Sequence, residues 1–283
     1  MREDWTTIIK PKEKLWRIDL RELWHYRDLC GLIVRRNITT QYKQTLLGPL
    51  WYIIQPLITM VMYMVVFGGI ANISTDGLPQ PLFYLGGICL WQYFSDCLNK
   101  TSSTFTDNAG IFGKVYFPRL IVPLANVISN LLRFGVQFVL FLVVYAIYQL
   151  WDTPGQIQTN GYALLLPLLI LMLAGLALGF GILFSSLTTK YRDLQLLLTH
   201  LVSLWMYATP IIYPMSTITN PKLHFIMGLN PLTGIVEAFK YGFLGAGEFS
   251  WGLLGYSLVF MVMLLIVGVV IFNRVQRTFM DTV

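Results

Sequence analysis

The stretch RRNITTQYKQTLLGPLWYIIQPLITMVMYMVVF, from Arg35 to Phe67, passes without a break from a basic segment into a long apolar one. Transfer of its two arginines and Lys43 from water into the bilayer core costs much free energy. Residues 46–70, in contrast, carry no charge and can cross a bilayer core of about 30 Å as a helix. Pro49 and Pro56 fall inside the crossing, which membrane helices tolerate when neighbouring groups satisfy the freed carbonyls. The stretch therefore predicts a membrane elbow that leads into a packed helical bundle.

The composition indicates an all-α polytopic membrane protein. Hydrophobic residues make up 55% of the 283 residues and charged residues 12%, against about 25% charged in soluble domains. Asp96, Asn99 and Lys100 weaken the second candidate span, so we expect it to be short, tilted or partly buried. Gly175 and Gly179 form a GxxxG pair in the fourth, which predicts close helix packing. The six candidate spans are residues 46–70, 82–101, 120–150, 162–188, 194–213 and 251–272.

The distribution of positive charge predicts the topology. Most of the 20 Lys and Arg residues precede the first span or lie in loops on the same side, while Lys222 and Lys240 fall outside this set and Arg133 lies within a span. Basic residues are retained in the cytoplasm, so we place both termini there and the loops 71–81, 151–161 and 214–250 outside. The net charge of +6 is thus a topology signal with no implication of nucleic-acid binding.

The predicted domains are a cytoplasmic N-terminal region (1–45), a six-span permease domain (46–272) and a cytoplasmic C-terminal tail (273–283). The N-terminal region has no apolar core typical of a signal peptide, so the first span must direct insertion. It contains an amphipathic helix predicted to lie in the membrane interface; an ordinary solvated helix packed on the bundle is the alternative. The apolar residues expected on one face of this helix are Leu20, Leu23, Trp24, Leu29, Leu32 and Ile33.

Catalytic or metal chemistry has little support in the sequence. Three cysteines are most simply buried thiols, with no disulfide or zinc framework, and three histidines are scattered. Asp96 lies near one edge of its span and Glu237 in an external segment, so we expect the acidic residues in the membrane to be unpaired and to form no proton or sodium relay. A membrane acyl- or glycosyltransferase would need a cluster of acidic, His or Ser groups at one membrane face, and none is evident.

Several short motifs follow one another in a fixed order relative to the six spans. They are residues 24–29 (WHYRDL), Arg36-Asn37, residues 42–48 (YKQTLLG), Trp51, Gln55-Pro56, residues 117–119 (FPR), 191–194 (YRDL), 209–214 (TPIIYP) and 230–232 (NPL). Together they resemble the permeases of type 2 ABC transporters that export O-antigen, capsule and teichoic acid chains. The resemblance covers nearly the whole chain.

The resemblance implies a homodimeric permease that moves a lipid-linked, O-antigen-like polysaccharide across a bacterial inner membrane through a conduit formed by the dimer. It also implies two copies of a separate cytoplasmic ATPase, which would hold ATP and Mg, and an N-terminal helix that flanks the cytoplasmic entrance. We expect no catalytic residue, cofactor or metal on this chain itself. A type 2 permease for a drug or lipid would share the topology and remains the alternative.

The cytoplasmic loop 101–119 carries Thr104, Thr106, Asp107 and Asn108 ahead of apolar residues, a set that can start and cap a short helix. A plain connecting loop is the alternative. The resemblance, which puts a coupling helix between spans two and three, favours the helix. Its candidate contacts with the ATPase are Asp107, Ala109, Ile111, Phe112, Lys114 and Val115.

The external segment 214–250 is too apolar for a free loop, yet prolines and glycines interrupt it. Asn230 can cap a helix that begins at Pro231, and the stretch to Tyr241 falls in the range of about 10–14 residues that dips into a membrane without crossing. Re-entrant helices are therefore predicted, with a helix lying on the external surface as the alternative. In the resembling exporters such helices form the outer gate, and the candidates here are Asn230, Pro231, Glu237, Phe239 and Tyr241.

A polar stripe marks the third span, where Asn126, Asn130, Arg133 and Gln137 recur at spacings of four, three and four. An intramembrane Arg is costly unless it faces a wet cavity or a partner, so the stripe is either conduit lining or an inter-helix hydrogen-bond seam. Aromatic rings in the first two spans can stack on sugars, although most membrane aromatics are packing or interface residues. The aromatic candidates for the conduit are Trp51, Tyr52, Tyr63, Phe67, Tyr84 and Trp91.

We predict that the purified permease has no ATPase activity of its own. Residues 110–115 (GIFGKV) come nearest to a phosphate-binding loop, but that motif requires Gly where Asn108 stands and Ser or Thr where Val115 stands. Phosphate release from ATP by the isolated chain, above that of a preparation from cells lacking it, would contradict the prediction.

Overall fold

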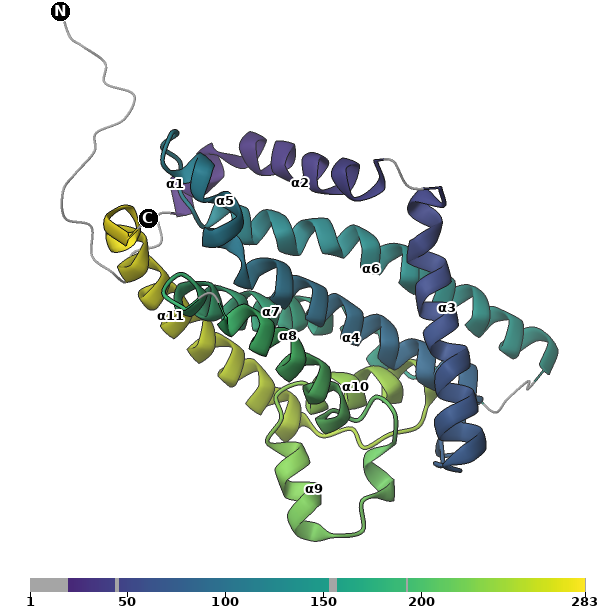
Figure 1. The fold of residues 1–283 in the computed structure, drawn as a ribbon. Helices are drawn as coiled ribbons and strands as arrows, with labels where there is room; N and C mark the ends of the chain where they lie inside the picture. Colours follow the sequence, from purple (N-terminus) through teal and green to yellow (C-terminus); the bar gives the residue numbers. More distant parts are fainter. Residues whose placement is uncertain (1–19, 44–45, 153–156, 192, 283) are drawn as a thin grey trace, which may run out of the picture.

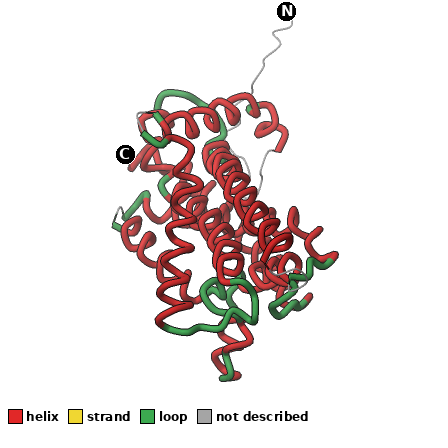
Figure 2. The backbone as a smooth tube through the Cα atoms, turned by 90° about the vertical axis from the view of Figure 1, so that its right-hand side faces the viewer, coloured by secondary structure: helices red, strands yellow, loops and turns green. Residues whose placement is uncertain are grey.

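The computed structural model describes residues 20–43, 46–152, 157–191 and 193–282, and every regular element in those ranges is a helix. Long helices run side by side as a bundle, and short ones lie at its two ends (Figures 1 and 2). The α-helices are α1 (Leu20–His25), α2 (Arg27–Tyr42), α3 (Trp51–Tyr63), α4 (Gln80–Ser102), α5 (Thr104–Phe112), α6 (Ile121–Ile147), α7 (Leu166–Thr188), α8 (Leu194–Trp205), α9 (Pro221–Gly228), α10 (Thr233–Leu244) and α11 (Trp251–Thr282). Short 3-10 helices cover Gly48–Leu50, Gly161–Leu165, Met206–Ala208 and Met215–Thr217, and π-helical turns cover Met64–Ile70 and Tyr148–Asp152.

Four helical segments are long and apolar enough to cross a membrane: 48–70, 121–150, 161–188 and 251–276. They coincide with four of the six predicted spans. Residues 1–19, which hold many of the basic residues used to predict the topology, lie outside the described residues, as does Arg192. The all-helical membrane class is therefore confirmed, with four candidate spans.

The predicted second span forms α4, which has 23 residues and occupies the centre of the bundle. It packs against α6 and α7, and it meets α3 in its N-terminal half through Tyr84 and Tyr63. Tyr84, Phe94 and Leu98 are fully buried in the main apolar core. The polar residues that weakened this prediction are accommodated because the helix is surrounded by other helices, not by lipid.

The predicted fifth span, 194–213, is helical only as far as Ala208. Thr209 is extended, with φ −121° and ψ 139°. The residue before a proline is biased towards this region because the proline ring clashes with a helical neighbour, and Pro210 also lacks an N–H donor. The chain therefore leaves the helix five residues before the predicted end of the span.

The predicted apolar face of the N-terminal helix is divided between two surroundings. Ile33 is buried in a small core formed with aromatic residues of α5 and the following loop, and α2 lies along α6 (Figure 1). Trp24 and Leu32 instead point to the outside, with 69% and 64% of their surfaces exposed. Packing on the bundle, the alternative to an interface helix, thus accounts for the buried side of α2.

The GxxxG pair of α7 lies against α11, as close helix packing predicts. A Cβ atom on Gly179 would lie 2.9 Å from Leu264 Cγ and 3.4 Å from the backbone nitrogen of Leu265. On the facing helix, a Cβ on Gly268 would lie 3.0 Å from the carbonyl oxygen of Gly179. The two backbones approach so closely that only glycine fits at these positions.

We predict that Gly179→Ala destabilises the fold by about 1–3 kcal/mol, because the added methyl group forces α7 and α11 apart. Gly135→Ala on α6 is the matched control, since a Cβ there meets nothing within 4 Å. Thermal unfolding of the detergent-solubilised variants measures the difference. Equal melting temperatures for the two variants would show that the glycine contact does not set the helix separation.

Candidate functional site

The polar stripe of α6 faces other helices, with all four of its residues buried. Asn126 donates to the backbone oxygen of Lys100 at 3.1 Å, and Gln137 donates to the side chain of Gln92 on α4. Asn130 accepts from Lys100 Nζ at 3.4 Å. We call the joint formed by these side chains of α4 and α6 the polar seam.

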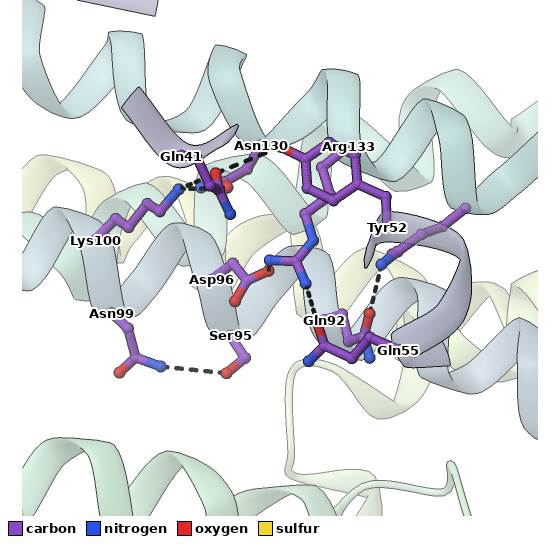
Figure 3. A network of polar contacts seen from close by, with 11 residues as sticks. Gln41, Tyr52, Gln55, Gln92, Ser95, Asp96, Asn99, Lys100, Asn130 and Arg133 are labelled. Carbon is purple, nitrogen blue, oxygen red and sulfur yellow. Dashed lines mark hydrogen bonds and ion pairs between the residues drawn. The ribbon is translucent and has the colours of Figure 1, made fainter. Parts of the chain in front are cut away.

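Arg133 is the most strongly bonded residue of the polar seam (Figure 3). One of its terminal nitrogens lies 2.6 Å from Asp96 Oδ2 on α4, and the other donates to Gln55 Oε1 on α3 at 2.7 Å. The guanidinium also sits over the ring of Tyr52, 5.2 Å from its centroid. A single cation therefore joins three helices, which satisfies the requirement that a charge inside a membrane be paired.

The N-terminal helix is attached to the same seam by amide groups. Asn37 on α2 donates to Asn126 Oδ1 at 3.0 Å. Gln41 Oε1 accepts from both Lys100 Nζ at 3.3 Å and the Tyr52 hydroxyl at 3.4 Å. The elbow between α2 and α3 is thus held on both sides by α4 and α6.

The prediction that the acidic residues are unpaired was wrong. Asp96 forms the ion pair with Arg133, and Glu237 on α10 lies 3.7 Å from Lys240 one helical turn later. Glu237 also accepts from the backbone N–H of Glu248 at 2.9 Å, while Lys240 donates to the carbonyl of Pro210. Within the described residues no group of three or more His, Cys, Asp or Glu side chains is arranged to hold a metal ion.

The aromatic candidates for the conduit are mostly inside the subunit. Tyr84 and Trp91 are buried in the core, and Tyr63 packs edge-on against Tyr84 with ring centroids 6.0 Å apart. Phe67 is half-buried beside Tyr63, and Tyr52 is buried beneath Arg133. Trp51 alone among these six is exposed, at 46%.

The short helix predicted in the loop 101–119 is present as α5, which begins at Thr104, the first of the four polar residues proposed to start it. Asp107 is exposed and accepts from Ser103, and Phe112 is buried between Phe105 and Phe117. The remaining candidates lie on the outer side of α5 and just after it: Ala109 is half-buried, whereas Ile111, Lys114 and Val115 are exposed.

The predicted gate helix begins at Thr233, two residues after Pro231. Asn230 accepts from the backbone N–H of Leu232, and its amide group donates to Ala208 and Thr209, so it forms a turn that ties this segment to the chain just after α8. Pro231, Glu237 and Phe239 are buried, and the half-buried Tyr241 stacks on Phe249 at 5.4 Å.

The sequence-based prediction did not include the α4 residues of the polar seam as a set. Gln92, Asp96 and Lys100 recur every four residues and so occupy one helix face, the same signal that identified the stripe of α6. Gln55 gave no periodic signal, because its partner lies 78 residues away.

We predict that Arg133→Leu lowers the stability of the folded protein by an amount on the order of 3 kcal/mol, because it leaves the Asp96 carboxylate without its cation. Arg133→Lys keeps the charge but lacks the planar fork that reaches both Asp96 and Gln55, so its loss should be smaller. The neutral pair Asp96→Asn/Arg133→Gln is the control and should recover most of the stability. The measurement is thermal stability and export per assembled complex on the same preparations. Normal stability of Arg133→Leu with export lost would contradict a seam and favour conduit lining.

Comparison with known proteins places these features in a family. The profile of the family described as ABC-2 type transporter matches residues 28–244. The O-antigen export system permease protein RfbA of Myxococcus xanthus is 29% identical over 223 residues, which cover 78% of this chain and 82% of that protein. RfbA of Klebsiella pneumoniae is 27% identical over 90% of this chain and 94% of its own length, and the polysialic acid transport protein KpsM of Escherichia coli is 24% identical over 87% and 93%. This chain, a bundle of apolar helices joined by a buried polar seam, belongs to the ABC-2 type transporter family of membrane permeases.

Proposed function

We propose that this chain is the permease subunit of an ATP-driven exporter that moves a lipid-linked polysaccharide, of the O-antigen type, across a bacterial inner membrane. The observation that carries the proposal is the similarity to O-antigen export permeases over 78–90% of the chain. The order of the short motifs relative to the spans supports the same function. This chain would form the path for the glycan, and a partner ATPase would supply the free energy of ATP hydrolysis.

In this proposal α4 and α8 cross the membrane together with the four apolar segments, which makes six spans. α4 crosses inside the bundle, where its polar side chains meet other helices. α8 and the 3-10 turn after it are shorter than the roughly 20 residues that span the hydrocarbon core, so the extended chain at Thr209 and Pro210 completes the crossing. One end of the bundle carries α2, α5 and the C-terminal end of α11, and it would face the cytoplasm. The opposite end, which carries α9, would face the exterior (Figure 1).

Two partners complete the proposed transporter. Two copies of an ATPase, holding ATP and Mg, would dock on the cytoplasmic end through the exposed side chains of α5. A second copy of the permease would cover the outer face of α3 and of the π-helical turn that follows it, where Ile58, Val61 and Val65 are each more than half exposed. The segment around α9 and α10 would form the outer gate, and because Glu237 and Lys240 are bonded to neighbouring segments, α10 would move together with them.

Deletion of the gene tests the function directly. Loss of export should leave lipid-linked glycan on the cytoplasmic leaflet and remove it from the cell surface, and the wild-type chain should restore both. Unchanged surface glycan, together with a changed sensitivity to drugs or a changed distribution of phospholipid, would favour the drug or lipid permease instead.

Docking of the ATPase yields a sharper prediction. Ile111→Ser and Val115→Ser remove exposed apolar side chains, so the fold should remain intact while affinity for the ATPase falls about tenfold and ATP use no longer drives export. Tyr191→Ser is the matched control, since Tyr191 is 52% exposed in another predicted cytoplasmic loop. Co-purification, coupled ATPase activity and export are measured together. Full coupling in the Ile111 and Val115 variants, or an equal loss in the control, would remove the special role of α5 and the residues just after it.

A further inference from the structure

In the second half of α4, the side chains that are only partly buried are all polar. Between Leu82 and Ser102 every residue is buried except Gln92, Ser95, Asp96, Asn99 and Lys100. Three of these belong to the polar seam. Ser95 and Asn99 point away from Arg133 (Figure 3), and Asn99 donates to Ser95 at 3.3 Å. The side-chain oxygen of Asn99 is buried and finds no donor in the described part of the chain.

The neighbouring helix α8 has two unlike exposed flanks on either side of its buried residues Leu198 and Val202. Leucines occupy one flank: Leu197, Leu201 and Leu204, which are 53%, 48% and 64% exposed. Gln195, Thr199 and Ser203 follow one another every four residues along the other flank. His200 and Leu196 lie between the two flanks on the outer side of the helix.

The polar flank of α8 is the one that adjoins α3. Met206, which continues this flank in the 3-10 turn, contacts the Tyr63 hydroxyl through its sulfur at 3.2 Å. On its other side α8 meets α4 through Trp205 and Phe94, whose ring centroids are 5.4 Å apart. On α4, Ser95 follows Phe94 directly and lies about three turns after Tyr84, which meets Tyr63 of α3. Ser95 is therefore on the face of α4 that carries the contact with α3, beside the contact with α8, and Asn99 lies one turn further along.

We propose that Ser95, Asn99, Gln195, Thr199 and Ser203 form a polar track along which the hydroxyl groups of a glycan chain are bound during export. The proposal rests on the proposed function and assigns the surface that the substrate touches. Lipid accounts for the leucine flank but not for the amides, because an amide without a partner is costly in hydrocarbon.

The chemistry of the track suits a polyol. Thr199 and Ser203 donate their hydroxyl protons to the carbonyls of Gln195 and Thr199, at 3.0 and 2.9 Å. Their oxygens therefore remain as acceptors for sugar hydroxyls, and the amide of Gln195 offers both donors and an acceptor. None of the five residues is charged, so the track binds each sugar weakly and in the same manner, which allows a long chain to slide.

Cysteine labelling in membrane vesicles of the assembled transporter tests the track without knowledge of the glycan. Thr199→Cys and Ser203→Cys should react with a charged, membrane-impermeant maleimide, whereas Leu201→Cys and Leu204→Cys on the other flank should not. Cys30 is replaced by Ser in all variants, and Cys89 and Cys97 are buried. Equal labelling on the two flanks, or none on the polar flank, would overturn the proposal; absence of labelling is also what a seam between two copies of the chain would give.

Bulky substitutions supply the functional measurement. Ser203→Trp should block the track and abolish glycan export per assembled complex, while Leu204→Trp on the leucine flank should retain it. Thr199→Val keeps the shape but removes the acceptor, so a partial loss is expected. Normal export by Ser203→Trp, in cells where the wild-type chain exports glycan, would contradict the track alone. Absence of glycan export by the wild-type chain would instead contradict the proposed function.

Discussion

The pairing of Arg133 with Asp96 is the interaction on which the arrangement of the central helices depends. A guanidinium in a membrane helix is tolerated only if its charge is met, and here a carboxylate at 2.6 Å and an amide at 2.7 Å meet it from two other helices. Because these partners have fixed positions, the ion pair fixes α3 and α4 relative to α6. The amides of α2 join the same network, which makes the elbow between α2 and α3 part of the core.

This constraint separates two kinds of polar residue that look alike in the sequence. All four residues of the α6 stripe are buried and bonded to partners inside the subunit, mainly on α4. The polar residues of α4 that point away from it, together with one flank of α8, make few contacts within the described chain. Polar side chains inside a bundle hold helices together, whereas those left open at its surface are available to bind.

Local sequence patterns accounted for the features that depend on neighbours along the chain. The uncharged runs located four spans, the GxxxG pair located the contact between α7 and α11, and the polar residues after Thr104 lie in a short helix. The ion pair of Asp96 was not predicted, because pairing depends on which faces of two separate helices meet. The end of the helical segment at Ala208, two residues before Pro210, was not predicted either. The candidates for coupling and for the outer gate remain predictions about partners and motions.

The most direct measurement is an electron cryo-microscopy map of the whole transporter, stalled with its glycan by an ATPase partner that binds but does not hydrolyse ATP. The account predicts density for the sugar chain beside Asn99, Thr199 and Ser203, with Arg133 still bonded to Asp96. Sugar density in contact with Arg133 and Gln137, with the ion pair broken, would contradict it.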